Sequence, residues 1–173
     1  MKKLFLIAIT LIMCVGMSAC TPVGNILSKF ENSSDKYITP DKQADNLTLQ
    51  IFECFLDKDS EELKSLFSKN IQDSYEHDTE IQEAFNYIDG NIISYDKPDG
   101  EIQGESRRGE KGVTELIFGG KIRNIETDKG KVYSISFTSY AINKDDENNV
   151  GVLSIGVIDS ELQKKSDSVS DYK

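Results

Sequence analysis

The feature that most constrains the fold is a change of hydrophobic period near residue 91. Before it, apolar residues recur at helical spacing, so that Ala44, Ile51 and Phe55 share one face of a helix. After it, apolar and polar residues alternate, which is typical of strands with one buried face. This order predicts one α+β domain over residues 41–160, with three N-terminal helices packed on a curved antiparallel sheet of about four strands.

Three segments of the first half carry helical signals. The first helix is predicted over residues 41–56. Asp59, followed three residues later by Glu62, resembles a capping box in which Asp replaces the usual Ser or Thr, and it predicts the start of a second helix. A third helix is expected from residue 78 or 79 to Gly90, since glycine suits the position after a helix end.

The alternating half divides into strands at glycine-rich and polar turns. Residues 101–112 are charged and rich in glycine, which predicts a loop or a weak edge strand. Gly119-Gly120 predicts a bulge or bend, and residues 128–130 predict a hairpin turn. The polar residues 161–173 are expected to form a tail. The predicted strands are residues 92–96, 113–126, 131–143 and 150–159.

The first twenty residues have the pattern of a lipoprotein signal peptide. Two lysines precede an uncharged apolar run over residues 4–16, which suits a secretory signal and falls short of the ~20 residues that span a bilayer. Small residues then lead into Cys20, as in a bacterial lipobox. We expect cleavage between Ala19 and Cys20 and acylation of the Cys20 thiol. An ordinary cleaved signal peptide and an uncleaved anchor are the alternatives.

Acylation predicts a location at the cell membrane, on the extracytoplasmic side. Residues 1–19 are then the signal peptide, residues 20–40 the lipidated N-terminus with a flexible tether, residues 41–160 the domain and residues 161–173 the tail. Each buried CH₂ group contributes about 0.8 kcal/mol, so that two or three acyl chains, such as palmitate, are expected to anchor the chain durably.

The charge of the processed chain argues against nucleic acid as a partner. Loss of the leader leaves 18 basic and 30 acidic residues, a net charge of −12. A phosphate backbone repels such a surface. An anionic membrane repels it too, so the lipid rather than charge is expected to hold the chain there.

Cysteine and histidine are too few for disulfide or zinc chemistry in the processed chain. Cys14 leaves with the leader and Cys20 becomes a thioether, so Cys54 has no intramolecular partner. Cys54 and His77 alone do not make a Cys/His zinc site, and no metal or cofactor site is predicted. Cys54 lies beside Phe55 and is expected to pack in the core, with a reactive thiol as the alternative.

Any histidine-dependent mechanism must use His77, because it is the only histidine in the sequence. Acidic residues surround it, which suits a general base oriented by a carboxylate. We expect instead an exposed loop histidine among solvated acids, because the segment has the character of a connection and no nucleophile accompanies it. No catalytic residue is therefore predicted. The nearby polar residues are Asp73, Tyr75, Glu76 and Asp78.

Two charged clusters have some features of ion sites. The acidic residues 145–147 lack the alternation and central glycine of a calcium loop, and we expect a solvated hairpin turn. Arg107, Arg108 and Lys111 lie close to glycines but lack the strand-to-helix context of an anion-binding loop. We expect a surface loop there.

Aromatic residues recur at positions that face the predicted interior. At this spacing we expect them to fill the core, and the alternative is that they line a pocket in a sheet that curves around the first helix. The candidate pocket residues are Phe55, Phe85, Phe118, Tyr133 and Phe137.

Four segments carry a resemblance to a known family: residues 59–68, 90–95, 127–130 and 149–155. In this order they are similar to uncharacterised lipoproteins of Gram-positive bacteria that carry a domain of unknown function. The resemblance implies the cystatin-like or nuclear-transport-factor-two-like fold, also called SnoaL-like, and an extracytoplasmic location. It implies no catalytic residue, because that family has none assigned.

These features together predict a membrane-anchored, non-enzymatic domain that binds a small-molecule ligand or a protein partner. One alternative is an enzyme of the SnoaL or ketosteroid-isomerase type, which needs an acid or base in its cavity. Another is an assembly module, such as a homodimer that pairs through the outer sheet face. The candidate residues on that face are Ser134, Ser136, Thr138 and Tyr140.

Overall fold

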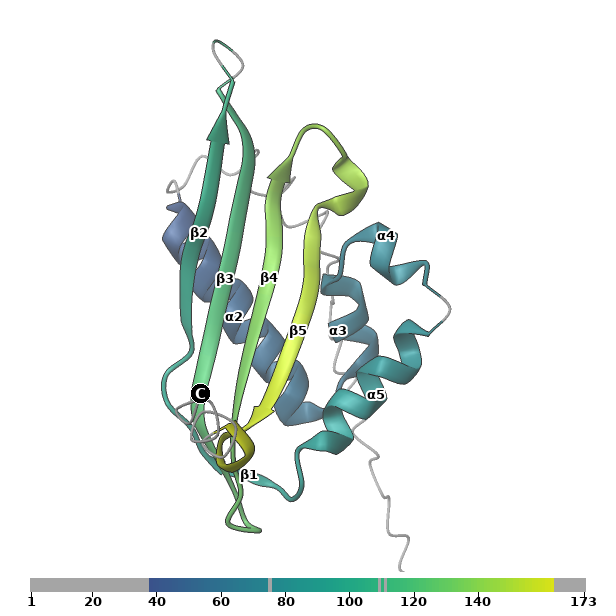
Figure 1. Cartoon of the computed structure of the whole chain (residues 1–173), viewed down its shortest axis with the longest axis vertical. Coiled ribbons are helices and arrows are strands. Elements are labelled where there is room, and N and C mark those ends of the chain that lie inside the picture. The colour runs from purple at the N-terminus through teal and green to yellow at the C-terminus, as the bar shows by residue number, and fades with distance from the viewer. Residues whose placement is uncertain (1–37, 75, 109, 111, 164–173) are drawn as a thin grey trace, which may run out of the picture.

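The computed structural model describes residues 38–74, 76–108, 110 and 112–163. Within this part the chain has the predicted α+β order, with helices that precede an antiparallel sheet (Figure 1). The helices are α2 (Pro40–Asp57), α3 (Ser60–Leu66), α4 (Lys69–Gln72) and α5 (His77–Tyr87). In the described ranges, no helix is long and apolar enough to cross a bilayer.

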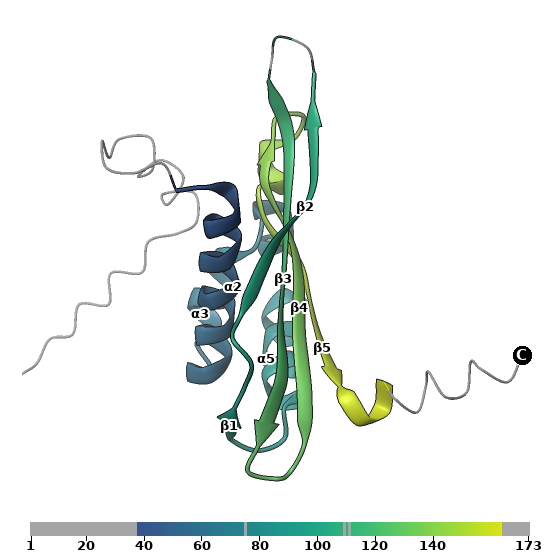
Figure 2. The ribbon, with the colours of Figure 1, turned by 90° about the vertical axis from the view of Figure 1, so that its left-hand side faces the viewer.

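Five strands form the sheet. They are β1 (Ile92–Ser94), β2 (Asp99–Arg107), β3 (Val113–Thr127), β4 (Val132–Asn143) and β5 (Gly151–Asp159). β3, β4 and β5 are neighbours in that order, while β1 and β2 both pair with the other side of β3. Figure 2 shows the helices on one side of this sheet, so the domain has two layers.

Both α2 and α3 begin at side-chain caps. Thr39 Oγ1 accepts a hydrogen bond from the Lys42 N–H (3.4 Å), and Pro40 occupies the first helical position. Asp59 Oδ1 accepts a hydrogen bond from the Glu62 N–H (2.9 Å). This bond confirms the predicted start of the second helix.

The structure differs from the predicted elements at short or irregular segments. α4 is an additional helix of four residues, a length at which hydrophobic period carries no signal. Of the two alternatives for residues 101–112, the edge strand is correct as far as Arg107. Residues 160–163 are helical, because Asp159 Oδ1 caps them by accepting a hydrogen bond from the Glu161 N–H (2.8 Å).

The predicted bulge at Gly119-Gly120 is wrong. The register of β3 runs unbroken through both glycines, which pair with Glu101 and Gly100 of β2. The register of β3 against β4 shifts on either side of them, between Leu116 and Ile117 and between Ile122 and Ile125, where Asn124 has a φ of 50°. At Gly120 glycine is needed for close packing against α2, whereas a Cβ at Gly119 would meet the side chain of Gln103 on β2.

α2 packs on the sheet at a pair of glycines. Gly100 and Gly120 lie opposite each other on β2 and β3. A Cβ atom at Gly100 would lie 2.5 Å from the carbonyl oxygen of Ala44, and one at Gly120 would overlap Thr48 Oγ1. Ala44 and Thr48 are fully buried. The absence of two Cβ atoms therefore lets the helix backbone approach the sheet closely.

Apolar side chains from the helices and from the inner face of the sheet form the main core. Along β4 the buried residues alternate with half-buried polar ones, as the sequence predicts for one buried face. A smaller cluster of Ala44, Leu116 and Phe118 lies where α2 begins. The main cluster includes Ile51, Phe52, Leu63, Ile122, Ile135 and Val152.

Replacing Gly100 by alanine is expected to lower the free energy of unfolding by about 1–3 kcal/mol, because the added methyl group meets the backbone of α2. Gly104→Ala in the same strand is the matched control, since its Cβ would lie 3.4 Å from Ile117 Cδ1. Urea unfolding of both variants measures the difference. Equal unfolding midpoints would contradict the close approach of α2.

Candidate functional site

An apolar cleft opens beside the last strand of the sheet. It lies among the helices α3, α4 and α5 and the strand β5, which Figure 1 shows together at one edge of the sheet. Its volume is about 310 Å³, against roughly 150 Å³ for an apolar cavity that takes up benzene. The polar residues of its lining are His77, Glu80 and Ser154. The apolar walls include Phe55, Leu63, Phe67, Ile81, Ala84 and Ile155.

The end of α3 is fixed to β5 by the backbone, which sets one wall of the cleft. Phe67 forms a parallel bridge with Val152, and the Ser68 N–H donates to the Val152 carbonyl oxygen (2.9 Å). Gly151 has a φ of 123°, and a Cβ there would lie 2.8 Å from the Ser68 nitrogen. Only glycine therefore suits the strand at this contact.

His77 is buried at the start of α5, with 2% of its surface exposed. Its imidazole meets the ring of Phe67 edge to face, with centroids 4.4 Å apart. Its Nε2 atom is buried and has no hydrogen-bond partner among the described residues. The expected exposed loop histidine is therefore wrong, because the buried face of α5 (Ile81 and Phe85) extends back to His77.

The acidic neighbours of His77 in sequence do not orient it. Asp78 forms an ion pair with Lys64 of α3 (2.5 Å), and Asp73 and Glu76 are exposed. Tyr75 lies outside the described residues. The structure therefore separates the histidine from the carboxylates that the sequence places beside it.

Burial lowers the pKa of His77 below its ordinary value of 6.5. The positive charge of Lys64 lowers the pKa further, while Glu80 and Asp78 act in the opposite direction. The imidazole is therefore neutral at neutral pH, and each of its nitrogens serves as a hydrogen-bond donor or an acceptor according to the tautomer.

The five aromatic residues predicted to line a pocket are all buried, and all but Phe118 belong to the main core. Phe55 lines the cleft, and Phe85 packs against it edge to face with ring centroids 5.0 Å apart. Phe137 lies in the main core, and Tyr133 beside it accepts a hydrogen bond from the Asp89 N–H (3.1 Å). Phe118 belongs to the smaller cluster near the start of α2.

Cys54 lies in the main core and is 2% exposed, as the sequence predicts. Burial raises the pKa of its thiol to about 12, and the charges of Glu62, Asp59 and Glu53 add to that rise. The thiol is therefore protonated at neutral pH, which makes it a poor nucleophile.

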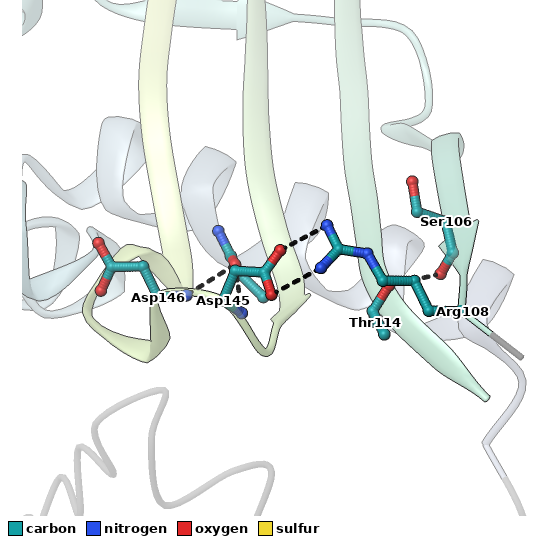
Figure 3. Close-up of polar contacts among 6 residues, drawn as sticks. Ser106, Arg108, Thr114, Asp145 and Asp146 are labelled. Atoms are coloured by element: carbon teal, nitrogen blue, oxygen red, sulfur yellow. Dashed lines mark hydrogen bonds and ion pairs between the residues drawn. The ribbon is translucent and has the colours of Figure 1, made fainter. Parts of the chain in front are cut away.

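The arginines of the predicted basic cluster form ion pairs within the chain, away from the cleft. Figure 3 shows Arg108, beyond the end of β2, in a two-pronged ion pair with Asp145 (3.1 and 2.7 Å). Arg107 pairs with Glu105 on its own strand. Lys111 lies outside the described residues. The two arginines therefore serve contacts within the chain.

The acidic residues 145–147 form the turn that the sequence predicts. Asn143 Oδ1 accepts hydrogen bonds from the N–H groups of Asp145 (3.2 Å) and Asp146 (3.0 Å), and a short 3₁₀ helix, Glu147–Asn149, follows. In the part of the chain that the structure covers, no group of three or more acidic, histidine or cysteine side chains is arranged to hold a metal ion.

The outer face of the sheet is polar along β4. Ser134, Ser136, Thr138 and Tyr140 are half-buried and alternate with the residues of the core. A shallow hollow of about 290 Å³ lies there, with Lys121 and Arg123 on its lining. Pairing of two chains through this face stays a prediction. Ala19 and Cys20, the predicted cleavage and lipidation residues, lie outside the described residues.

The sequence missed most of the cleft, because its walls come from separate elements. Leu63, Phe67 and Leu153 meet only in the folded chain. One signal was present: His77, Ile81 and Ala84 have the i, i+4, i+7 spacing of a single helix face. Extending that face back by one turn would have placed His77 inside.

Fold and cleft define an α+β domain with an apolar cleft at one edge of its sheet. The chain belongs to the family described as Domain of unknown function (DUF5104), which matches residues 50–160. The match runs from within α2 to the residue after β5 and includes His77. It confirms the predicted resemblance to a family with a domain of unknown function. No curated protein matches the chain.

Because the chain has a single histidine, the imidazole NMR signals of His77 are unambiguous, and their titration is expected to give a pKa below 6.5. The unfolded chain takes up this proton near pH 6.5 and the folded chain only at lower pH. The free energy of unfolding therefore falls as the pH drops below 6.5. His77→Phe is expected to lose less stability between pH 7 and pH 5, and a pKa of 6.5 or higher would contradict the burial.

Proposed function

We propose that this chain is a membrane-anchored, extracytoplasmic lipoprotein whose domain binds a small molecule without catalysing a reaction. The observation that carries the binding role is the cleft beside β5. Its walls are mostly apolar, and it has a buried histidine in its lining. Sites for small molecules combine apolar walls with a few placed polar groups, and the cleft has that composition.

The anchor is proposed from the sequence. The apolar leader and the small residues before Cys20 support signal-peptide cleavage there and attachment of acyl chains such as palmitate. The domain begins with α2 at Pro40, so residues 20–39 would join it to the membrane. The acidic charge of the chain supports attachment by lipid rather than by basic residues.

The finer fold assignment and the source are part of the same proposal. We assign the domain to the cystatin-like or SnoaL-like fold, supported by the long helix α2 that lies across the antiparallel sheet (Figure 1). The lipobox and the family resemblance support a Gram-positive bacterium as the source.

An enzyme of the SnoaL or ketosteroid-isomerase type is the second candidate, and His77 is the observation that favours it. A neutral imidazole beside a cleft is able to act as a general base. In the described residues, however, no carboxylate is hydrogen-bonded to this side chain, which supports binding over catalysis. Loss of a measured turnover in His77→Gln, with the fold intact, would favour the enzyme.

Filling the cleft tests the binding role. Ala84→Trp places a large ring in the cleft, whereas Gln82→Trp places the same ring on the exposed side of the same helix. In a screen of small aromatic fragments by ligand-observed NMR, we expect fragments that bind the native chain and Gln82→Trp to lose binding to Ala84→Trp. Circular dichroism checks that both variants fold. Fragments that bind all three proteins equally would exclude the cleft as their site.

Removal of the acylated thiol tests the anchor. Cys20→Ser is expected to block lipidation and processing, because the lipid is joined through that sulfur atom. The measurements are the mass of the N-terminal peptide and the distribution of the chain between membrane and soluble fractions of the producing bacterium. Cys54→Ser is the control, since it removes a buried thiol of the core. Normal processing of Cys20→Ser would overturn the lipoprotein assignment.

A further inference from the structure

Among the described residues the buried Nε2 atom of His77 has no hydrogen-bond partner, although such atoms nearly always have one. Three side-chain atoms of the described residues are buried without a partner: Ser68 Oγ, Thr127 Oγ1 and His77 Nε2. Of these residues, only His77 lines the cleft. An unpaired buried polar atom is destabilising, so the side chain of His77 has hydrogen-bonding capacity that no described residue uses.

The charges around His77 disfavour an anionic ligand. The imidazole itself is neutral. Lys64, whose positive charge lowers the pKa of His77, is paired with Asp78. Glu80 adds negative charge to the lining of the cleft, and the chain as a whole has a net charge of −10. A carboxylate or phosphate would therefore be repelled and would lose its hydration against apolar walls.

A cationic ligand is disfavoured inside the cleft for a related reason. The positive charge would lose its hydration when it is placed against the apolar side chains of Phe55, Phe67 and Ile81. Glu80, the acidic residue of the lining, is exposed to solvent, so its attraction for a buried cation is screened. An uncharged polar group suits a neutral imidazole better.

Size and composition define the rest of the ligand. A volume of about 310 Å³ holds one ring with a short substituent. We infer that the cleft takes an uncharged, mainly apolar molecule with one hydroxyl or amide group, which hydrogen-bonds to the imidazole of His77. Such a group both donates and accepts, so it suits either tautomer of the imidazole. This inference rests on the proposed binding role of the cleft and adds the class of ligand.

Three probes of similar shape test the inference: 4-ethylphenol, ethylbenzene and 4-ethylbenzoate. Their dissociation constants are measured at pH 7.5 for the full chain in detergent micelles, with Ala84→Trp as the background for partition into detergent. We expect 4-ethylphenol to bind about tenfold more tightly than ethylbenzene, since one hydrogen bond is gained at a buried site. The anion 4-ethylbenzoate is expected to bind more weakly than either.

His77→Phe, which keeps an aromatic ring and removes both nitrogens, is expected to bind the phenol and ethylbenzene within twofold of each other. The native chain gives a second readout, because its single imidazole has one pair of ring-nitrogen resonances. These ¹⁵N resonances are expected to shift with 4-ethylphenol and to stay in place with ethylbenzene. This readout holds even where the variant does not fold.

The outcomes separate the inference from the binding role on which it rests. If ethylbenzene and 4-ethylphenol bind the native chain equally, the hydrogen bond to His77 is refuted while the cleft stays a binding site. Tightest binding of 4-ethylbenzoate would refute the uncharged class in the same way. If no probe binds the native chain above the Ala84→Trp background, the binding role and the ligand class fail together.

Discussion

The close contact of α2 with the glycine pair of β2 and β3 is the interaction on which the architecture depends. With no Cβ at Gly100 or Gly120, the small face of Ala44 and Thr48 rests on the strands themselves. α2 then lies obliquely across the sheet, as Figure 1 shows, and the remaining helices cover the edge at β5. The position of the cleft follows from this division of the inner face between α2 and the later helices.

Contacts between distant segments give the cleft its shape. The bridge from Phe67 to Val152 holds the end of α3 against β5, and the Lys64–Asp78 pair joins α3 to the start of α5. Because the side chain of Asp78 is 73% exposed, that pair contributes modestly to stability. The backbone bridge and the apolar walls therefore do more to define the cleft than the ion pair does.

The chemical character of the cleft depends on one side chain. Without His77 the buried lining of the cleft would be apolar, and it would not distinguish among apolar molecules of the same size. A neutral imidazole adds one directional contact without adding charge. Such a site favours selective binding of uncharged molecules, and catalysis would need a second group placed beside the imidazole.

The sequence by itself determined the α+β order, the cap at Asp59, the hairpin at residues 128–130 and the burial of Cys54, because these depend on local periodicity and local hydrogen bonds. Only the tertiary structure decided the role of Gly119-Gly120 and the burial of His77. The local pattern around Gly120 is the same whether this glycine bends the strand or receives a helix. A histidine among acids has the same sequence whether it faces water or a cleft. Gly120 meets Thr48 of α2, and His77 packs against Phe67 at the end of α3, and both contacts form only in the folded chain.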